Sequence, residues 1–470
     1  MDLERPLRHP DTDSAPLMNK RARWLVLVGF LFPGSAQVLA GNRKLGRFGL
    51  GATILMLLIA VISVIGLLFF RTATLSVFTN SLVLLVVQWL ILGYAVMWLI
   101  LGFDTLRLAR LVKVTPGWRV PVAIVSVILT VLPVAGAAYA SVTVGSARGA
   151  FSDIFGGGAP AVEPVDGRYN IMLLGVDPGE DREGMRPDSI SLVSVDAETG
   201  QSVIVGLPRE LTQMPFDEAS PLYPVYPDGF CSPTNNYEGD GYCFTTGYLN
   251  AMITELSDSG SPSYEGMFAE ATSQGSTPGI EAMKDAVSGA TGLDVQFYVL
   301  IDMAGFSSLI DALGGVTVDV QQPIPLGGYE DPYTGEWVEG DSYIEPGVQT
   351  LNGEYALMFA RVRHGLANGD FDRMQHQRQL QAAILAQMNP ANVLLRFQEL
   401  AGAGSELVKT DIPESMLGRF VDLAARAKDH TPVSVEIAPP AIDPEYVDYA
   451  LVHQMVADAV AAASPPQEAE

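Results

Sequence analysis

Four apolar stretches near the N-terminus limit what this chain can fold into more than any other feature. A helix of about 20 apolar residues crosses the hydrocarbon core of a bilayer, and three of the stretches reach that length. The first is shorter and carries Pro33-Gly34-Ser35 at its centre, which breaks a helix and favours a re-entrant segment. We therefore predict an α-helical membrane region over residues 24–141, with a re-entrant segment at 24–40 and spans at about 48–70, 81–103 and 120–140.

The distribution of basic residues predicts how this region is oriented. Lysines and arginines gather in the polar leader 1–23 and in the loops 41–47 and 104–119, whereas the loop 71–80 carries a single charge. The positive-inside rule places the basic segments in the cytoplasm, so three spans leave everything after residue 141 outside the cell. Four spans with the same outside domain would need an outside N-terminus, against that rule. We expect no cleavable signal peptide, because no small-residue cleavage site follows the first apolar run.

Acidic residues dominate the remainder of the chain. After residue 119 the sequence holds 15 Lys and Arg residues against 48 Asp and Glu residues. A surface of that charge repels the phosphate backbone of nucleic acids, which we therefore exclude as partners. An arginine cluster within such a domain is either a site for a specific anion or a set of structural ion pairs.

The acidic part has the pattern of one α/β domain. Short apolar runs typical of buried strands alternate with helical patterns, which predicts a mainly buried central sheet over residues 166–462. A Gly/Ala-rich tether, residues 142–165, precedes this domain, and residues 463–470 form a disordered tail. Strands are expected at 169–175, 189–195, 202–207, 296–301, 316–320 and 433–437, a helix at 393–401, and a turn-rich segment at 321–346.

The two cysteines predict a disulfide. Cys231 and Cys243 close a short loop rich in turn-forming residues, and an extracellular location favours their oxidation. Free thiols are the alternative. A zinc site would need two further ligands, and the nearby sequence offers no histidine.

The most specific chemical signal is an arginine-rich stretch that leads into a helix. Arg361 and Arg363 are two residues apart, and Arg373 and Gln377 share one helix face. Asp370 suits the start of that helix, where the dipole is positive. The planar fork of arginine binds phosphate oxygens in pairs. Taken alone, the stretch is equally compatible with a surface helix whose arginines pair with its own acids.

Acids and arginines also end several predicted strands. Asp177 follows a buried strand, which is where α/β sheets place ligand groups. Arg186 and Asp188 occupy the next loop, and Arg209 follows a further strand. Carboxylates together with arginines favour a metal–diphosphate site, in which Mg²⁺ (or Mn²⁺) takes carboxylate oxygens and arginines neutralise the phosphates.

Five segments of the chain form one recognisable series: NIMLLGVD (170–177), RPDSISLVSVD (186–196), IVGLPRE (204–210), FYVLIDMAGFSSLIDALGGVTVDV (297–320) and LNGEYALMFARVRHGLANGDFDRMQHQRQ (351–379). In these segments the sequence resembles the LytR-CpsA-Psr proteins of Gram-positive bacteria. The resemblance implies a three-layer α/β/α fold with an apolar groove for a polyprenyl chain, for which the predicted helix faces 281–288, 304–313 and 380–400 are candidates. It also implies a cell-membrane enzyme that acts outside the cytoplasm and transfers a polyprenyl-diphosphate-linked glycopolymer onto a sugar hydroxyl of peptidoglycan.

The resemblance assigns roles to the acids and arginines. It implies that Asp177 and Asp188 are metal-associated and catalytic carboxylates, either of which could take the proton of the sugar hydroxyl, and that Asp370 is a further acidic position. The diphosphate cradle that it implies consists of Arg186, Arg209, Arg361, Arg363, Arg373 and Gln377, with Arg186 and Arg209 also catalytic. Glu210 departs from the family pattern, which has Asp there, and His376 stands where an arginine is common. Two alternatives to the transferase are a polyprenyl-diphosphate pyrophosphatase and a non-catalytic envelope anchor or regulator that binds lipid-linked glycan.

Overall fold

The computed structural model divides the chain into two compact units, Met1–Gly149 and Ala150–Glu470. It describes residues 7–70, 74, 77–78, 80–154, 161–177, 185–230, 247–257, 266–331, 333–334, 337–366, 369–387 and 408–464. The predicted disulfide between Cys231 and Cys243, the predicted helix at 393–401 and most of the predicted tail lie outside the described residues.

The first unit is entirely helical in its described residues. Its elements are α2 (Ala15–Leu31), α3 (Ser35–Ala40), α4 (Arg43–Phe69), α6 (Ser81–Ala109), a 3₁₀ turn η1 (Leu111–Lys113) and α7 (Pro116–Ile154). Within the described part of the chain, three helices are long and apolar enough to cross a membrane: Arg43–Phe69, Ser81–Lys113 and Pro116–Ser146. Their exposed side chains are largely Leu, Ile, Val and Phe, as lipid-facing helices require.

The chain reverses direction between α2 and α3, within the segment predicted to be re-entrant. Gly34 has a φ of +100°, and a Cβ atom there would lie 2.5 Å from the carbonyl oxygen of Gly46 on α4. Only glycine fits this turn, because it tolerates both the positive φ and the close backbone approach. The helical structure is longer than the hydropathy indicated. α2 begins at Ala15, inside the predicted leader, and α7 continues to Ile154, inside the predicted tether.

A mixed six-stranded sheet forms the centre of the second unit. The spatial order is β10-β3-β2-β1-β4-β9. β1 runs parallel to β4, and β10 runs parallel to β3, while the other neighbours are antiparallel. The strands are β1 (Arg168–Val176), β2 (Pro187–Asp196), β3 (Ser202–Leu207), β4 (Phe297–Asp302), β9 (Val408–Thr410) and β10 (Val433–Glu436).

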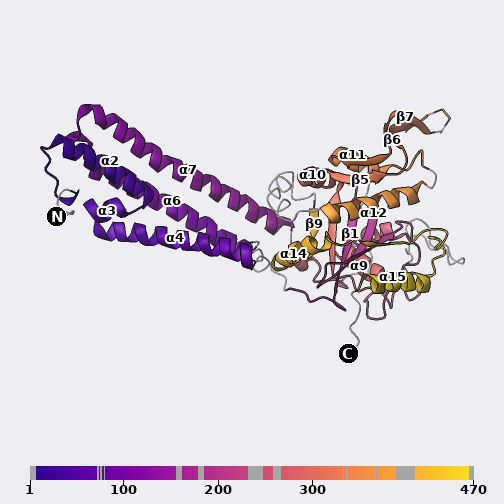
Figure 1. Cartoon of the computed structure of the whole chain (residues 1–470). Helices are drawn as coiled ribbons and strands as arrows, with labels where there is room; N and C mark the ends of the chain where they lie inside the picture. The colour runs from indigo at the N-terminus through magenta and orange to yellow at the C-terminus, as the bar shows by residue number, and fades with distance from the viewer. Residues whose placement is uncertain are drawn as a thin grey trace. The chain divides into compact units, whose positions relative to one another are not determined.

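Helices cover both faces of this sheet, which confirms the predicted three-layer α/β/α fold (Figure 1). Alternate residues of the strands face opposite layers: Val203 and Val205 face one layer, whereas Ile204 packs with Ala382 of the other. Every residue of β3 is buried, as expected for a strand covered on both sides. One layer holds α8 (Met252–Ser257), α9 (Pro278–Thr291) and α15 (Tyr449–Ala463), with the 3₁₀ turns η4 (Leu249–Ala251) and η5 (Thr272–Gln274); the other holds α12 (Asp370–Gln387), η6 (Glu414–Met416) and α14 (Leu417–Ala427).

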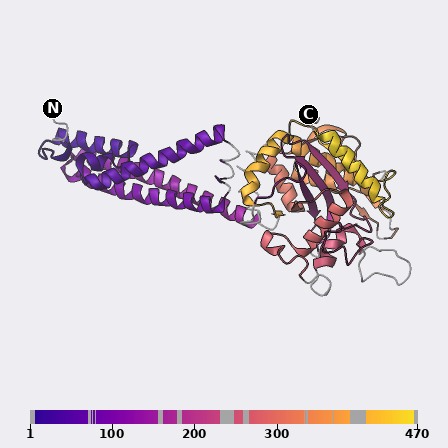
Figure 2. The same ribbon diagram turned by 90° about the horizontal axis from the view of Figure 1, so that it is seen from below.

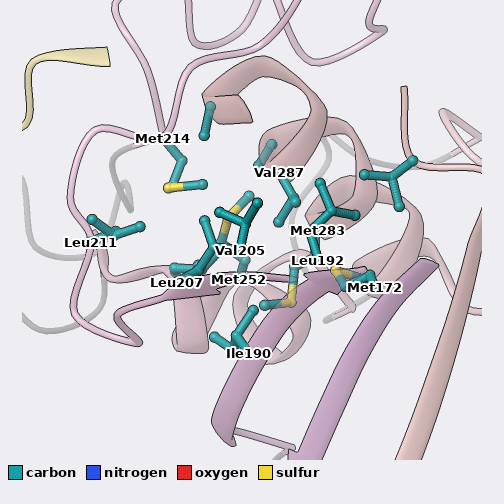
Figure 3. Close-up of a cluster of buried hydrophobic side chains, with 14 of the residues drawn as sticks. Met172, Ile190, Leu192, Val205, Leu207, Leu211, Met214, Met252, Met283 and Val287 are labelled. Carbon is teal, nitrogen blue, oxygen red and sulfur yellow. The ribbon is translucent and has the colours of Figure 1, made fainter. Parts of the chain in front are cut away.

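The main hydrophobic core lies between the sheet and α9. Met172, Leu192 and Val205 project from the strands and meet Met283 and Val287 of the helix (Figure 3), and all five side chains are fully buried. Thr277 caps α9 by accepting a hydrogen bond from the backbone N–H of Ile280. The apolar side chains of the predicted groove face at 281–288 are enclosed in this core. Figure 2 shows the strands between their helical layers from below.

A smaller subdomain adjoins the second helical layer. β5 (Val316–Val320) pairs with β8 (Gly347–Leu351), and β6 (Ile324–Glu330) forms an antiparallel hairpin with β7 (Trp337–Ile344). With α10 (Met303–Leu313) and α11 (Gly353–Arg361), these strands enclose a second apolar cluster. The cluster includes Phe359 of α11 and Leu380 of α12. The sequence predicts a turn-rich segment at 321–346, but the described part of this segment is largely strand. The prediction is wrong because glycines that suggest turns occupy a bulge within β6.

A buried ion-pair group ties α9 to the edge of the sheet. Lys284 Nζ lies 2.9 Å from Asp411 Oδ2 and 3.1 Å from Glu281 Oε2. The backbone N–H of Tyr298 on β4 donates to Asp411 Oδ1 at 2.8 Å. The Asp411 side chain is only 7% exposed, so its loss would leave Lys284 with one partner in a site that water barely reaches.

We predict that Asp411→Ala lowers the free energy of unfolding by about 3 kcal/mol or more, because removing one member of a buried ion pair leaves the other charge uncompensated. Urea unfolding of the full chain measures this change. Asp422→Ala is the matched control: it breaks an ion pair with Arg426, which is 47% exposed, and should cost about 0–1 kcal/mol. Equal losses in the two variants would contradict the structural importance of the buried group.

Candidate functional site

Two carboxylates meet at one end of the central sheet. Asp177 directly follows β1, and Asp188 is the second residue of β2. Because these strands are antiparallel neighbours with Val176 opposite Pro187, the end of β1 lies beside the start of β2. The register shifts next to Gly175, which marks a bulge of the kind that re-aims side chains near functional sites. The sheet thus brings together two acids from separate sequence motifs.

Arg209 enters the same place from the end of β3. Its Nη1 atom lies 2.6 Å from Asp188 Oδ1, and its Nη2 atom lies 3.2 Å from Glu210 Oε1. Arg209 and Asp188 are 21% and 24% exposed, so their ion pair is partly shielded from water. The backbone N–H of Asn250 donates to the Arg209 carbonyl at 3.0 Å and fixes this segment from the other side. Asn250 was not anticipated from the sequence, because nothing in a polar loop indicates which backbone it will pair with.

The turn between α11 and α12 supplies two further arginines. Arg361 is the last residue of α11, and its Nη2 atom lies 3.2 Å from Asp177 Oδ2. Arg363 lies between two acids, with Nη2 3.6 Å from Asp188 Oδ1 and Nε 3.4 Å from Asp370 Oδ1. Both side chains reach solvent, at 56% exposure for Arg361 and 37% for Arg363.

The first turns of α12 complete the cluster. The Nη2 atom of Arg373 lies 3.0 Å from Asp370 Oδ1 and donates to the backbone oxygen of Asp188 at 3.1 Å. The Arg373 side chain is only 3% exposed. Gln377 donates from Nε2 to the carbonyl oxygen of Ala360 at 3.1 Å, so it braces α12 against the end of α11.

Arg186 stands apart from the ion-pair cluster. It precedes β2, is partly exposed, and forms no ion pair with any residue that the structure describes. Thr254 of α8 donates from Oγ1 to the carbonyl oxygen of the preceding Met185 at 3.0 Å, which holds this segment near the sheet end. Of the predicted site residues, the structure joins all but Arg186 and Gln377 by ion pairs.

His376 packs against Phe359 of the second apolar cluster and lies outside the arginine cluster. Its ring lies 4.3 Å from the ring of Phe359, and the residue is only 8% exposed. Burial lowers the pKa of His376, although the charge of Asp372 and a backbone hydrogen bond at Phe359 oppose this. At position 376 the chain therefore has a buried aromatic ring that packs on Phe359.

The surroundings of the cluster lower the pKa of both Asp188 and Arg373, but for different reasons. Burial alone would raise the pKa of Asp188, but the hydrogen bond and charge of Arg209, with the charges of Arg373 and Arg363, lower it below its ordinary value. For Arg373, burial dominates over the attraction of Asp370 and lowers the pKa to about 10. Arg373 is thus still protonated at neutral pH, and Asp188 is fully ionised.

The arrangement can exchange its internal carboxylates for the oxygens of a bound anion. Arg209 and Arg373 are fixed by short or buried contacts, whereas Arg361 and Arg363 are exposed and can turn toward a ligand. A diphosphate offers several oxygens that suit guanidinium forks at these positions. The N-terminus of α12 adds the positive end of a helix dipole beside Asp370.

The carboxylates fit a metal only as a partial ligand set. Among the residues that the structure describes, no group of three or more His, Cys, Asp or Glu side chains is placed to hold a metal ion. Mg²⁺ characteristically takes one or two carboxylates and completes its shell with substrate phosphates and water. Asp177 and Asp188 fit that mode, in which the diphosphate itself supplies the remaining oxygens.

We predict that Asp188→Asn lowers the free energy of unfolding at pH 7 by about 1–3 kcal/mol, because Arg209 and Arg363 lose a charged acceptor and Arg373 loses the attraction of that charge. The folded-state pKa of Asp188 is depressed, so its stabilisation is present above the ordinary Asp pKa of about 4 and is lost as the pH falls through the lower folded value. Urea unfolding at a series of pH values should show the wild-type advantage shrinking in acid. Asp429→Asn, at an exposed site, is the control and should behave as wild type at every pH. A pH-independent difference would contradict this assignment.

Comparison with known proteins gives the domain its relatives. Residues 252–464 match the model of the LytR_cpsA_psr family. Biofilm regulatory protein A of Streptococcus mutans is 23% identical over 305 residues, which cover 63% of this chain and 63% of the relative. The polyisoprenyl-teichoic acid–peptidoglycan teichoic acid transferase TagU of Halalkalibacterium halodurans is 31% identical over 134 residues, 28% of this chain and 40% of the relative.

The matches extend over only part of these relatives and of this chain. The chain spans less than two thirds of the length of either curated relative. Among solved structures, Bacillus subtilis TagV superposes with a TM-score of 0.40 at 19% identity, covering 63% of this chain and 98% of that one. The residues that the family model matches fall in the α/β unit, which therefore carries a LytR_cpsA_psr family domain.

Proposed function

We propose that this protein is a membrane-anchored phosphotransferase that attaches a polyprenyl-diphosphate-linked glycopolymer to a sugar hydroxyl of peptidoglycan. The observation that carries the proposal is the cluster of Arg209, Arg361, Arg363 and Arg373 around the ends of β1 and β2. Such a density of guanidinium groups in an acidic domain suits a small, multiply charged anion. The relative TagU, which transfers teichoic acid to peptidoglycan by its name, supports the choice of substrate.

The membrane unit supports a donor that is confined to the bilayer. Its three apolar helices would keep the α/β domain beside the lipid surface. The basic loops 41–47 and 104–119 support an extracytoplasmic α/β domain under the positive-inside rule. A lipid-linked donor then needs to present only its diphosphate and glycan to the site.

In the proposed reaction, the hydroxyl oxygen of the acceptor sugar attacks the phosphorus that carries the glycan. A new P–O bond forms, the bridging P–O bond of the diphosphate breaks, and polyprenyl monophosphate leaves with the bonding electrons. The arginines stabilise the charge that develops on the leaving phosphate, and Arg209 and Arg373 are already held in place before the substrate arrives. Mg²⁺ held by Asp177, Asp188 and the diphosphate would supply further neutralisation of that charge.

The two carboxylates are suited to different tasks. Asp188 is held between three arginines, and its lowered pKa makes it a poor proton acceptor. Among the residues that the structure describes, Asp177 pairs with one arginine, the exposed Arg361, and a bound diphosphate can displace this contact. We therefore propose that Asp177 accepts the proton of the attacking hydroxyl and that Asp188 positions the arginines.

We predict that the full chain in lipid nanodiscs releases polyprenyl phosphate from a short polyprenyl diphosphate-sugar when Mg²⁺ and a peptidoglycan fragment are present. EDTA should abolish release. Arg363→Ala and Asp177→Asn should each lower the rate by about 10²-fold, since each removes one group that acts on the transition state. Phosphate release and glycan transfer are both measured by chromatography.

Arg419→Ala is the matched control for this experiment. Arg419 is 45% exposed, pairs with Glu163 and lies over the ring of Tyr169, away from the arginine cluster, so its loss should leave the rate unchanged. Release without dependence on the acceptor would favour a pyrophosphatase. Binding of the lipid without any release, in a folded protein, would favour an anchor or regulator and would contradict the proposal.

A further inference from the structure

The ion pairs of Arg363 hold its side chain only weakly in position. Its two ion pairs are long, at 3.4 Å and 3.6 Å, and its side chain is 37% exposed. The turn that carries it also contains Gly365 and Gly369, both at positive φ, which are the most permissive residues for backbone motion. The position of Arg363 therefore depends on what holds this turn in place.

The neighbouring residue provides such a support. The imidazole of His364 stacks on the indole of Trp337, with ring centroids 4.0 Å apart and an interplanar angle of 14°. Trp337 begins β7 of the hairpin and is 38% exposed. The stack therefore connects the arginine-bearing turn to the β6–β7 hairpin, whose strands are labelled in Figure 1.

The hairpin is itself anchored firmly enough to act as a brace. Ile324 and Ile344 pair at its base and are 0% and 3% exposed in the second apolar cluster. At the Trp337 end, a Cβ atom on Gly328 would lie 2.6 Å from Trp337 Cζ2, so the bare backbone of β6 packs directly against the indole. The indole is thus held by the hairpin backbone and by His364.

We propose that Trp337 is a positioning residue for the diphosphate site, which it serves by stacking on His364 and so holding Arg363 toward Asp188 and Asp370. This inference rests on the proposed function only for the identity of the substrate. The brace itself acts on any anion that Arg363 binds. Trp337 touches no reacting atom, so its loss should weaken donor binding more than it slows the chemical step.

The first test is steady-state kinetics of the full chain in nanodiscs. Trp337→Ala should raise KM for the polyprenyl diphosphate donor about three- to tenfold with a smaller change in kcat, given the usual strength of aromatic stacking. Trp337→Phe keeps a ring for His364 and should restore most of the affinity. Tyr333→Ala is the matched control, because Tyr333 belongs to the same hairpin and is 96% exposed.

The second test reads the stack itself and needs no turnover. Inorganic pyrophosphate is titrated into the full chain while tryptophan emission is recorded. The other four tryptophans, Trp24, Trp89, Trp98 and Trp118, all belong to the first unit, so Trp337→Phe supplies the background to subtract. We expect pyrophosphate to change the emission of Trp337, and His364→Ala to abolish that change.

The outcomes separate this inference from the proposed function. Wild-type KM and pyrophosphate affinity in Trp337→Ala would overturn the positioning role, whatever the reaction. A wild-type chain that lacks transfer activity but shows the His364-dependent emission change would refute the transferase and leave the brace intact. A raised KM in Trp337→Phe equal to that in Trp337→Ala would show that the stack is not the cause, and would also overturn the inference.

Discussion

The candidate site depends on Asp188, a single residue that three arginines contact. Asp188 meets Arg209 and Arg363 through its side chain, while Arg373 binds its backbone oxygen. These arginines come from the end of β3, the α11–α12 turn and the first turn of α12. Without a common acceptor they would repel one another across a partly buried space. Asp188 is therefore what allows the chain to concentrate positive charge in a domain that is otherwise strongly acidic.

The fold explains why this concentration occurs where it does. The antiparallel pairing of β1 and β2 brings Asp177 and Asp188 to one end of the sheet, and β3 delivers Arg209 beside them. The helical layer on the α12 side then places Arg373 over the same strands, with Gln377 fixing α12 to the end of α11. Buried residues hold the site's inner wall, and exposed Arg361 and Arg363 form its outer edge. In a site with a rigid base and movable outer groups, Arg361 and Arg363 can exchange their carboxylate contacts for those of an anion while Arg209 and Arg373 stay in place.

Much of this arrangement could be predicted from the sequence. The parts that could not be predicted were missed for physical reasons. Continuous apolar runs such as 169–175 and 202–207 identified strands covered on both faces, and acids or arginines directly after them indicated the sheet-end site. The hairpin was missed because Gly327 and Gly328 read as turn formers, although they occupy a bulge in β6. The three-residue β9 is too short to leave a pattern. Which arginine pairs with which acid, and the stacking of Trp337 on His364, depend on tertiary contacts that have no signal in sequence spacing.

The account's central claim is that the arginine cluster binds a diphosphate by exchanging its own carboxylates for phosphate oxygens. The most direct measurement is a calorimetric titration of pyrophosphate into the full chain and into the double variant Arg209→Ala/Arg363→Ala, each with and without Mg²⁺. The account predicts saturable binding by the wild type, strengthened by Mg²⁺, and a loss of affinity of about 100-fold or more in the double variant, since each of the two charge-assisted contacts contributes about 1.5–3 kcal/mol. Equal affinity in the two proteins would contradict the claim and leave the cluster as a set of structural ion pairs.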